Sequence, residues 1–135
     1  MNAGGDVAIG APRIGGRPWE IGVSNPFDPG TDFAILHVTH GGVASSGKDR
    51  RHWSRNGFFN HHIIDPFTGL PAASDVLRAT IVTTSVIEAE AAAKAALILG
   101  SGRGMDWIEA DPSLAGLFIL DNGDILYSRR IQSYL

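Results

Sequence analysis

The sequence predicts an α+β protein with a largely antiparallel sheet and helices packed on one face. Several runs of alternating or β-branched residues precede the clearest helical segment, an alanine-rich stretch at residues 86–99. Two further apolar runs follow this helix, separated by an Asp-Asn-Gly sequence that is typical of a hairpin. Strands before a helix and a hairpin after it favour α+β architecture over the regular alternation of a parallel sheet. A length of 135 residues suits one domain.

The strands are predicted from alternation and from β-branched composition. WEIGVS at 19–24 alternates apolar and polar residues, and VLRATIVTTS at 76–85 is rich in Val, Ile and Thr, which favour strands. In chain order, we expect strands at residues 4–9, 19–24, 33–39, 43–44, 76–85, 114–120 and 124–128. Proline, glycine and aspartate indicate loops at 11–18 and 25–32, and the polar, basic residues 48–60 indicate an exposed excursion.

The clearest helix is expected at residues 86–99. Ser85 and Glu88 have the capping-box spacing, in which the serine side chain accepts from the glutamate amide and the glutamate reaches back to the serine amide. Alanine-dense sequence then favours helix as far as Gly100, which supplies the left-handed residue that ends it. We expect a second helix from about residue 104 to 110.

Composition argues against several classes of function. A formal net charge of −3 and a pI near 5.9 give no electrostatic support for binding nucleic acid. The chain has no cysteine, so it has no disulfides, thiolate nucleophiles or Cys-based metal sites. No run approaches the roughly 18 to 20 apolar residues that span a bilayer. Residues 1–10 lack the basic and apolar regions of a signal peptide, and the compartment stays undecided.

Residues 61–69, HHIIDPFTG, concentrate polar and turn-forming side chains. Because side chains alternate along a strand, we expect one of His61 and His62 to face a ligand and the other to face away. Asp65 precedes a proline, which disfavours helical geometry, and Thr68 can bond amides of the same turn. A structural turn is the better interpretation of this segment alone. Histidine beside a fixed carboxylate nevertheless suits general-base work or phosphate binding.

Two glycine-containing segments offer backbone to a ligand. Gly4 and Gly5 precede Asp6, and adjacent glycines let a ligand approach the backbone closely. Ser45, Ser46 and Gly47 offer hydroxyls and amides in what we expect to be a concave turn, suited to phosphate or carbonyl oxygens. Each segment alone is more often an ordinary turn or loop.

The order of these segments resembles the ApbE family of FAD-dependent protein FMN transferases, in their C-terminal half. The succession NAGGD, PWEIGVSNP, GGVASSG, HHIIDPFTG-LPA and ATIVTTS, before an alanine-rich helix ending in LILG, spans roughly residues 2–128. The resemblance implies an enzyme that cleaves FAD and attaches FMN through a phosphoester to a threonine or serine of a target protein, with Mg²⁺. It also implies a T-fold-like architecture, with residues 1–135 as a single ApbE-like flavin-transferase domain.

The resemblance also gives expected roles to individual residues. His62 is expected to contact the FAD phosphates and to assist deprotonation of the acceptor hydroxyl. Asp65 and Thr68 complete the expected catalytic set by holding the turn. The expected cofactor-binding residues are Gly5, Asp6, Ser46, Gly47, His62 and Ile63, the last through its backbone.

Two departures from the family pattern bear on mechanism. Where the family helix has an aspartate and, four residues later, a threonine that help hold Mg²⁺, this chain has Glu90 and Lys94. Without the family, this spacing is that of an ordinary helix-stabilising ion pair. With the family, Glu90 is the expected metal residue, and Lys94 would supply positive charge to the pyrophosphate in place of the metal. The chain is also about half the family's usual length, so self-association or a completing chain is expected.

Three functions stay open. The leading one is FMN transfer from FAD to a flavin-acceptor protein, with release of AMP. The alternative is a catalytically silent FAD-binding or protein-interaction domain with a degenerate metal site. A flavin-independent phosphoesterase using His62 is disfavoured, because the sequence shows no second cluster of metal ligands. Members of the family often act outside the cytoplasmic membrane, and residues 1–10 carry no export signal that would indicate this.

Overall fold

The computed structural model describes residues 1–49 and 51–135. Its strands are β1 (Asn2–Ala3), β2 (Asp6–Ile9), β3 (Trp19–Ser24), β4 (Asp32–Val38), β5 (Gly41–Gly47), β6 (His52–Arg55), β7 (Phe58–His61), β8 (Val76–Thr83), β9 (Ala115–Leu120) and β10 (Ile125–Tyr127). Its helices are α1 (Val86–Leu99) and α2 (Ser101–Ala110), with short 3₁₀ helices η1 (Ile14–Gly16) and η2 (Arg129–Tyr134).

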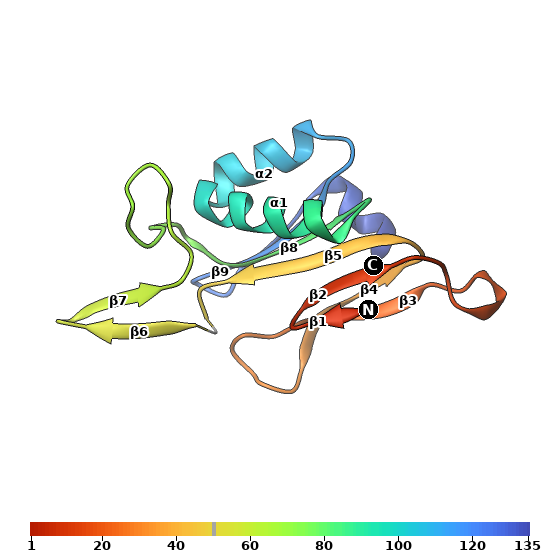
Figure 1. Ribbon diagram of the computed structural model, residues 1–135, viewed down its shortest axis with the longest axis horizontal. Coiled ribbons are helices and arrows are strands. Elements are labelled where there is room, and N and C mark those ends of the chain that lie inside the picture. Colours follow the sequence, from red (N-terminus) through yellow and green to blue (C-terminus); the bar gives the residue numbers. More distant parts are fainter. Residues whose placement is uncertain (50) are drawn as a thin grey trace.

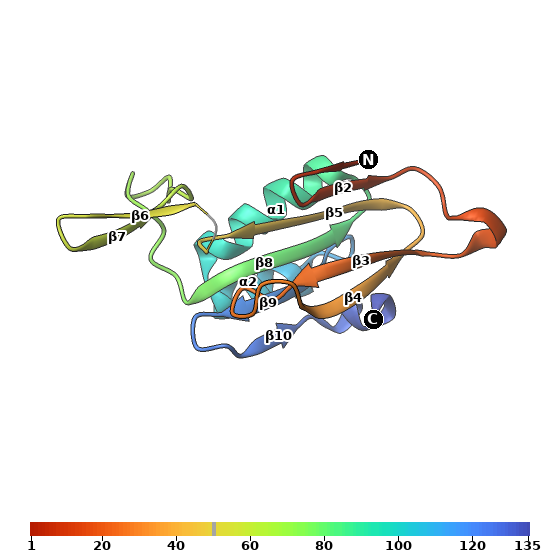
Figure 2. The same cartoon turned by 90° about the horizontal axis from the view of Figure 1, so that it is seen from below.

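Six of the strands form one antiparallel sheet in the order β1-β2-β5-β8-β9-β10. Helices α1 and α2 cover one face of this sheet, and the two-stranded sheet of β3 and β4 lies on the other side (Figures 1 and 2). The predicted α+β class, with a largely antiparallel sheet and its two α-helices on one face, is confirmed. The likeness to the T-fold stays a prediction.

Two apolar cores lie on the two faces of the main sheet. Strand β8 shows the division, because Ala79 and Ile81 are buried in the core beneath the α-helices. Val82 of the same strand belongs to the other core, with Val23 of β3 and Leu36 of β4. Alternate residues of one strand therefore build both cores, as the period of two requires.

The strands differ from the prediction at two glycine-containing segments. Gly4 and Gly5 do not open a strand but form the turn between β1 and β2, with φ of 70° and 115°. Residues 43–44 belong to the longer strand β5, which also includes the Ser45–Gly47 segment that was expected to be a turn. The segment is extended because β5 pairs with β8 along residues 42 to 47.

Residues 51–59 are exposed as expected, but they are not irregular. The prediction is wrong for Lys48, which is only 8% exposed because its ammonium is drawn to the Asp121 carboxylate and the Ser74 carbonyl. Strands β6 and β7 form a hairpin that projects from the body of the protein (Figure 1). Asn56 (φ 52°) and Gly57 (φ 76°) make its turn, the Asn-Gly combination that two-residue hairpins favour. The sequence therefore contained the signal for this hairpin, although the prediction placed no strands here.

Helix α1 begins and ends where the sequence predicts. The Ser85 hydroxyl oxygen accepts from the backbone N–H of Glu88 (3.2 Å), and Gly100 ends the helix at φ 82°. The second half of the expected capping box is wrong: the Glu88 carboxylate accepts from the hydroxyl of Thr84 (2.7 Å), not from the Ser85 amide. Thr84 offers this donor because its side chain lies within reach, one residue before the cap.

Helix α2 begins at Ser101, three residues before the expected start. Gly100 separates the two helices, and the Asp75 carboxylate accepts from the Ser101 N–H (2.9 Å) and from the Ser101 hydroxyl. A side chain 26 residues away along the chain thus supplies the cap that the local sequence lacks.

Across the described residues, neither helix is long and apolar enough to cross a membrane.

Candidate active site

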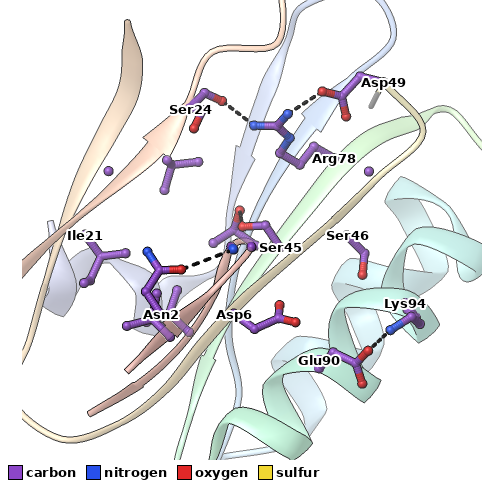
Figure 3. A pocket seen from close by; sticks show the side chains of 18 of the residues that line it. Asn2, Asp6, Ile21, Ser24, Ser45, Ser46, Asp49, Arg78, Glu90 and Lys94 are labelled. Carbon is purple, nitrogen blue, oxygen red and sulfur yellow. Dashed lines mark hydrogen bonds and ion pairs between the residues drawn. The ribbon is translucent and has the colours of Figure 1, made fainter. Parts of the chain in front are cut away.

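A pocket of about 900 Å³ opens at the edge of the main sheet (Figure 3). The hairpin of β1 and β2, the strand β3, the end of β5 and the helix α1 all contribute to its wall. It lies here because β2 pairs only with residues 41–43 of β5, so the rest of β5 has no paired strand on that side. The sequence-predicted residues that line this pocket are Gly5, Asp6, Ser46, Gly47, His62, Glu90 and Lys94.

The turn between β1 and β2 brings backbone and one acidic residue to the pocket. Gly5 donates its N–H to the side-chain oxygen of Asn2 (3.3 Å), and its positive φ favours glycine. A Cβ added at Gly5 would meet no other atom within 4 Å, so the space beside this backbone is open. Asp6 follows directly and also lines the pocket.

The two serines of β5 point to opposite faces of the sheet. Ser45 is hydrogen-bonded through its hydroxyl to the hydroxyl of Thr80 (2.8 Å). Ser46 pairs across the sheet with Ala79, a core residue beneath the helices, and lies on the α1 side (Figure 3). Both serines line the pocket, which therefore wraps around the open edge of β5.

Glu90 and Lys94 lie one helical turn apart on α1 and form an ion pair, with the Lys94 ammonium donating to the Glu90 carboxylate. Their side chains are 46% and 43% exposed, respectively, and both line the pocket. This is the ion pair that the spacing alone predicts. Within residues 1–49 and 51–135, no group of three or more His, Cys, Asp or Glu side chains could hold a metal ion.

The adjacent histidines point in opposite directions, as alternation along a strand predicts. The His62 side chain is exposed and lines the pocket, and its Nδ1 lies 3.3 Å from the carbonyl oxygen of Arg51. The His61 side chain is only 3% exposed and contacts the carbonyl oxygen of Ala72 (3.1 Å). Of the two imidazoles, only that of His62 is available to a ligand in the pocket.

Asp65 and Thr68 do not line the pocket but hold the turn. The Asp65 carboxylate accepts from the N–H of Phe67 (2.9 Å), and the Thr68 hydroxyl oxygen accepts from the N–H of Leu70 (3.2 Å). The Asp65 N–H also donates to the Leu70 carbonyl (2.9 Å). Their contacts support the turn-holding part of the expected role and place neither residue beside the pocket.

Ile63 does not line the pocket either. Its side chain is 3% exposed and belongs to the core beneath the helices. Its N–H donates to Nδ1 of His61 (3.2 Å), and its carbonyl accepts from the N–H of Ala72 (2.9 Å). The backbone that was expected to face the cofactor therefore makes hydrogen bonds within the protein.

The prediction missed four charged residues of the pocket wall, Glu20, Asp49, Arg51 and Arg78. Arg78 of β8 is 5% exposed, donates to the carbonyl oxygen of Ser24 (2.8 Å) and forms an ion pair with Asp49. All three residues line the pocket (Figure 3). An arginine in a buried strand needs a partner, and this requirement was the only signal in the sequence for the ion pair. It does not identify which acidic residue is the partner.

The fold and the pocket define a class of protein: an α+β protein with a ligand-sized site at the open edge of an antiparallel sheet. The model of the ApbE family matches residues 1–118. This chain belongs to the ApbE family.

Individual relatives agree with this assignment. The FAD:protein FMN transferase of Treponema pallidum is 34% identical over 102 residues, which cover 75% of this chain and 28% of that protein. The FAD:protein FMN transferase of Vibrio cholerae is 30% identical over 112 residues, covering 82% of this chain and 34% of that protein. The chain therefore spans about a third of the length of these relatives.

Solved structures show the same fold. The crystal structure of the ApbE protein from Thermotoga maritima matches with a TM-score of 0.86 at 33% identity, over 98% of this chain and 43% of that one. The flavin transferase ApbE from Vibrio cholerae matches with a TM-score of 0.79 at 28% identity, over 99% of this chain and 43% of that one.

Proposed function

We propose that residues 1–135 act as one flavin-transferase domain, which transfers FMN from FAD to a threonine or serine hydroxyl of a target protein and releases AMP. One observation supports this above all: Gly5, Asp6, Ser46, Gly47 and His62 line a single pocket of about 900 Å³. This volume is within the range of cofactor sites. Relatives that this chain matches bear the name FAD:protein FMN transferase.

His62 is the proposed general base. The Arg51 carbonyl can only accept a hydrogen bond, so the contact to Nδ1 of His62 (3.3 Å) places a proton on Nδ1, and in the neutral ring Nε2 is then the unprotonated nitrogen. Nε2 would take the proton of the acceptor hydroxyl, while the hydroxyl oxygen bonds to the phosphorus of the FMN half of FAD. The phosphoanhydride bond breaks, and AMP leaves with its electron pair.

Magnesium, which the resemblance implies, does not fit the residues at the expected position. The Glu90 carboxylate is paired with Lys94, and an ammonium beside the carboxylate would repel a divalent cation. Lys94 is the proposed source of positive charge for the FAD pyrophosphate, because its ammonium lies on the pocket wall and can donate three hydrogen bonds.

The same ion pair favours a second candidate function, a silent FAD-binding domain that has lost its metal site. The two functions differ in whether AMP is released. The experiment incubates the purified protein with FAD and an acceptor protein, with and without Mg²⁺, and follows AMP by chromatography. Release of AMP supports the transferase. A yellow protein that retains intact FAD and releases no AMP supports the silent domain.

We also propose that a second copy of the chain contacts the β6–β7 hairpin. Trp53, Phe58 and Phe59 of this hairpin are between 50% and 73% exposed, and exposed apolar groups of this kind mark interaction sites. The described residues 51–62 include two arginines and no acid, whereas the chain as a whole has a net charge of −3, so the hairpin and the rest of a second copy carry charges of opposite sign. A monomeric mass in solution would contradict this proposal.

A further inference from the structure

The buried ring of His61 makes two hydrogen bonds with the backbone. Its Nε2 lies 3.1 Å from the carbonyl oxygen of Ala72, and its Nδ1 lies 3.2 Å from the backbone nitrogen of Ile63. A carbonyl accepts and an N–H donates, so Nε2 carries the proton and Nδ1 does not. The ring is therefore neutral in this arrangement, and its tautomer is fixed by its two partners.

These two bonds close the chain around His62. The bond from the Ile63 N–H to His61 joins residues two apart, which bends the backbone at the residue between them. The bond to Ala72 ties the other end of the 63–72 loop to the same ring, and the Ala72 N–H donates to the Ile63 carbonyl (2.9 Å). The His62 side chain leaves this bend toward the pocket.

We infer that His61 is a positioning residue, whose neutral ring holds the backbone bend that directs His62 into the pocket. The orientation of the His62 side chain follows from the contacts of His61 and His62. The effect of this orientation on catalysis rests on the proposed function, in which His62 is the general base. A misdirected base costs rate because a displacement of about 1 Å in an active site can cost on the order of 100-fold.

Protonation of His61 would undo the arrangement, because Nδ1–H and the Ile63 N–H would then both be donors. The ionisable groups near the ring are Lys48, His62 and Asp121, together with His52, its cross-strand partner. Burial is the largest cause that lowers the pKa of His61 below its ordinary 6.5, and Lys48 and His62 act in the same direction. The neutral ring therefore persists at pH 7, and the bend is lost only as the pH falls below 6.5.

A first experiment reads the tautomer directly. The measurement is made at about pH 7.5, about one unit above the usual histidine pKa. Long-range proton–nitrogen NMR correlations of the wild-type protein should show His61 protonated at Nε2 and unprotonated at Nδ1. A ring protonated at Nδ1 overturns the inference. This measurement needs no variant and no activity.

A second experiment uses His61→Leu and His61→Asn. Leucine removes both bonds and should lower the rate of AMP release on the order of 100-fold, with little change in the FAD dissociation constant. Asparagine can accept the N–H two residues ahead as in an Asx turn, so it should recover part of that rate. His37→Leu is the matched control, because His37 is an exposed residue of β4 outside the pocket.

The pH dependence separates positioning from a merely structural role. The ratio of the wild-type rate to the His61→Asn rate cancels the titration of groups that the two proteins share. This ratio should fall as the pH drops below 6.5, because only the wild type loses its acceptor by protonation. A ratio that is flat with pH, or a His61→Leu rate within about twofold of wild type, overturns the inference.

A failure of the proposed function can be told apart from a failure of this inference. If the wild type binds FAD but releases no AMP, the transferase proposal fails while the NMR test still stands. The His62 ring resonances should then differ between the wild type and His61→Leu. Unchanged His62 resonances overturn the positioning role whether or not the protein is an enzyme.

Discussion

Arg78 of β8 and Asp49, which follows β5, form an ion pair whose side chains are only 6% and 15% exposed. The Arg78 guanidinium also reaches the carbonyl oxygen of Ser24 at the end of β3. The main sheet and the β3–β4 sheet are thereby joined at the side of the pocket. Asp49 Oδ1 is buried and has no hydrogen-bond partner among the described residues, so this carboxylate depends on Arg78.

Replacing Arg78 by alanine should therefore cost about 3 kcal/mol of unfolding free energy, because it leaves a buried carboxylate without its counter-charge. Urea denaturation measures this change. Arg103→Ala, in an exposed part of α2, is the control and should stay within about 0.5 kcal/mol of wild type. The double change Arg78→Met with Asp49→Asn should recover much of the loss. A cost below about 1 kcal/mol for Arg78→Ala would show that Asp49 is solvated in some other way.

Lys94→Gln should weaken FAD binding about tenfold, since it removes one charge-assisted hydrogen bond worth about 1.4 kcal/mol. Lys94→Arg keeps the charge and should bind nearly as well. Quenching of flavin fluorescence gives both dissociation constants. The binding should also become less sensitive to salt in the glutamine variant. Equal affinity of Lys94→Gln and wild type would remove Lys94 from the site.

Metal dependence can be introduced on the same helix face. The double change Glu90→Asp with Lys94→Thr removes the ammonium and leaves a carboxylate and a hydroxyl four residues apart, both hard oxygen ligands that suit Mg²⁺. FAD binding by this variant should fall when EDTA is added, while binding by the wild type should not respond. Loss of FAD from the wild type on addition of EDTA would contradict the proposed role of Lys94.

His62→Gln should lower AMP release by about 10² to 10⁴ and leave FAD bound. The reason is that glutamine keeps a polar side chain at the pocket wall but cannot accept a proton from the acceptor hydroxyl. AMP chromatography and flavin absorbance separate rate from binding. His40→Gln provides the control, because His40 is an exposed residue that does not line the pocket. Equal rates for the wild type and His62→Gln would exclude His62 as the base.

Asp75 should make stability depend on acid pH. Hydrogen bonds from the hydroxyl and N–H of Ser101 lower the pKa of Asp75 below its ordinary 3.8. The folded state therefore favours the carboxylate, so the stabilisation is present above pH 3.8 and is lost as the pH falls through the lowered pKa.

Asp75→Ala should cost about 1 kcal/mol at pH 7 by removing the cap of α2, and the cost should shrink at pH 2.5. The control is Asp106→Ala on the exposed side of α2, and urea denaturation at both pH values is the measurement. A cost that does not change with pH would contradict the assignment.

The sequence predicts those parts of the fold that local chemistry decides. Strand β3 occupies residues 19–24 as predicted, because alternation of WEIGVS is a local pattern. Helix α1 follows its serine cap and stops at its glycine for the same reason. The hairpin of β6 and β7 was missed because its aromatic residues Trp53, Phe58 and Phe59 are exposed and His61 is its one buried residue, so no buried face produces an apolar period. There the Asn-Gly pair was the only local signal.

The candidate site was predictable in part. Gly5, Asp6, Ser46, Gly47 and His62 were named from sequence and lie in one pocket. The pairing of Arg78 with Asp49 and the capping of α2 by Asp75 could not be predicted, because each joins residues more than 25 positions apart in the chain. Such contacts depend on strand order and register, which no local pattern contains.

The pocket wall is drawn from two hairpin strands near the start of the chain, the neighbouring β3, the end of β5, part of β8 and one face of α1. No single stretch of the chain makes the site, so the pocket exists only in the assembled sheet. Ligand occupancy and global unfolding are then thermodynamically linked: FAD at a hundredfold excess over its dissociation constant would add about 2.7 kcal/mol to the free energy of unfolding. A melting curve recorded with increasing flavin is thus a measurement of this pocket, even before any acceptor is known.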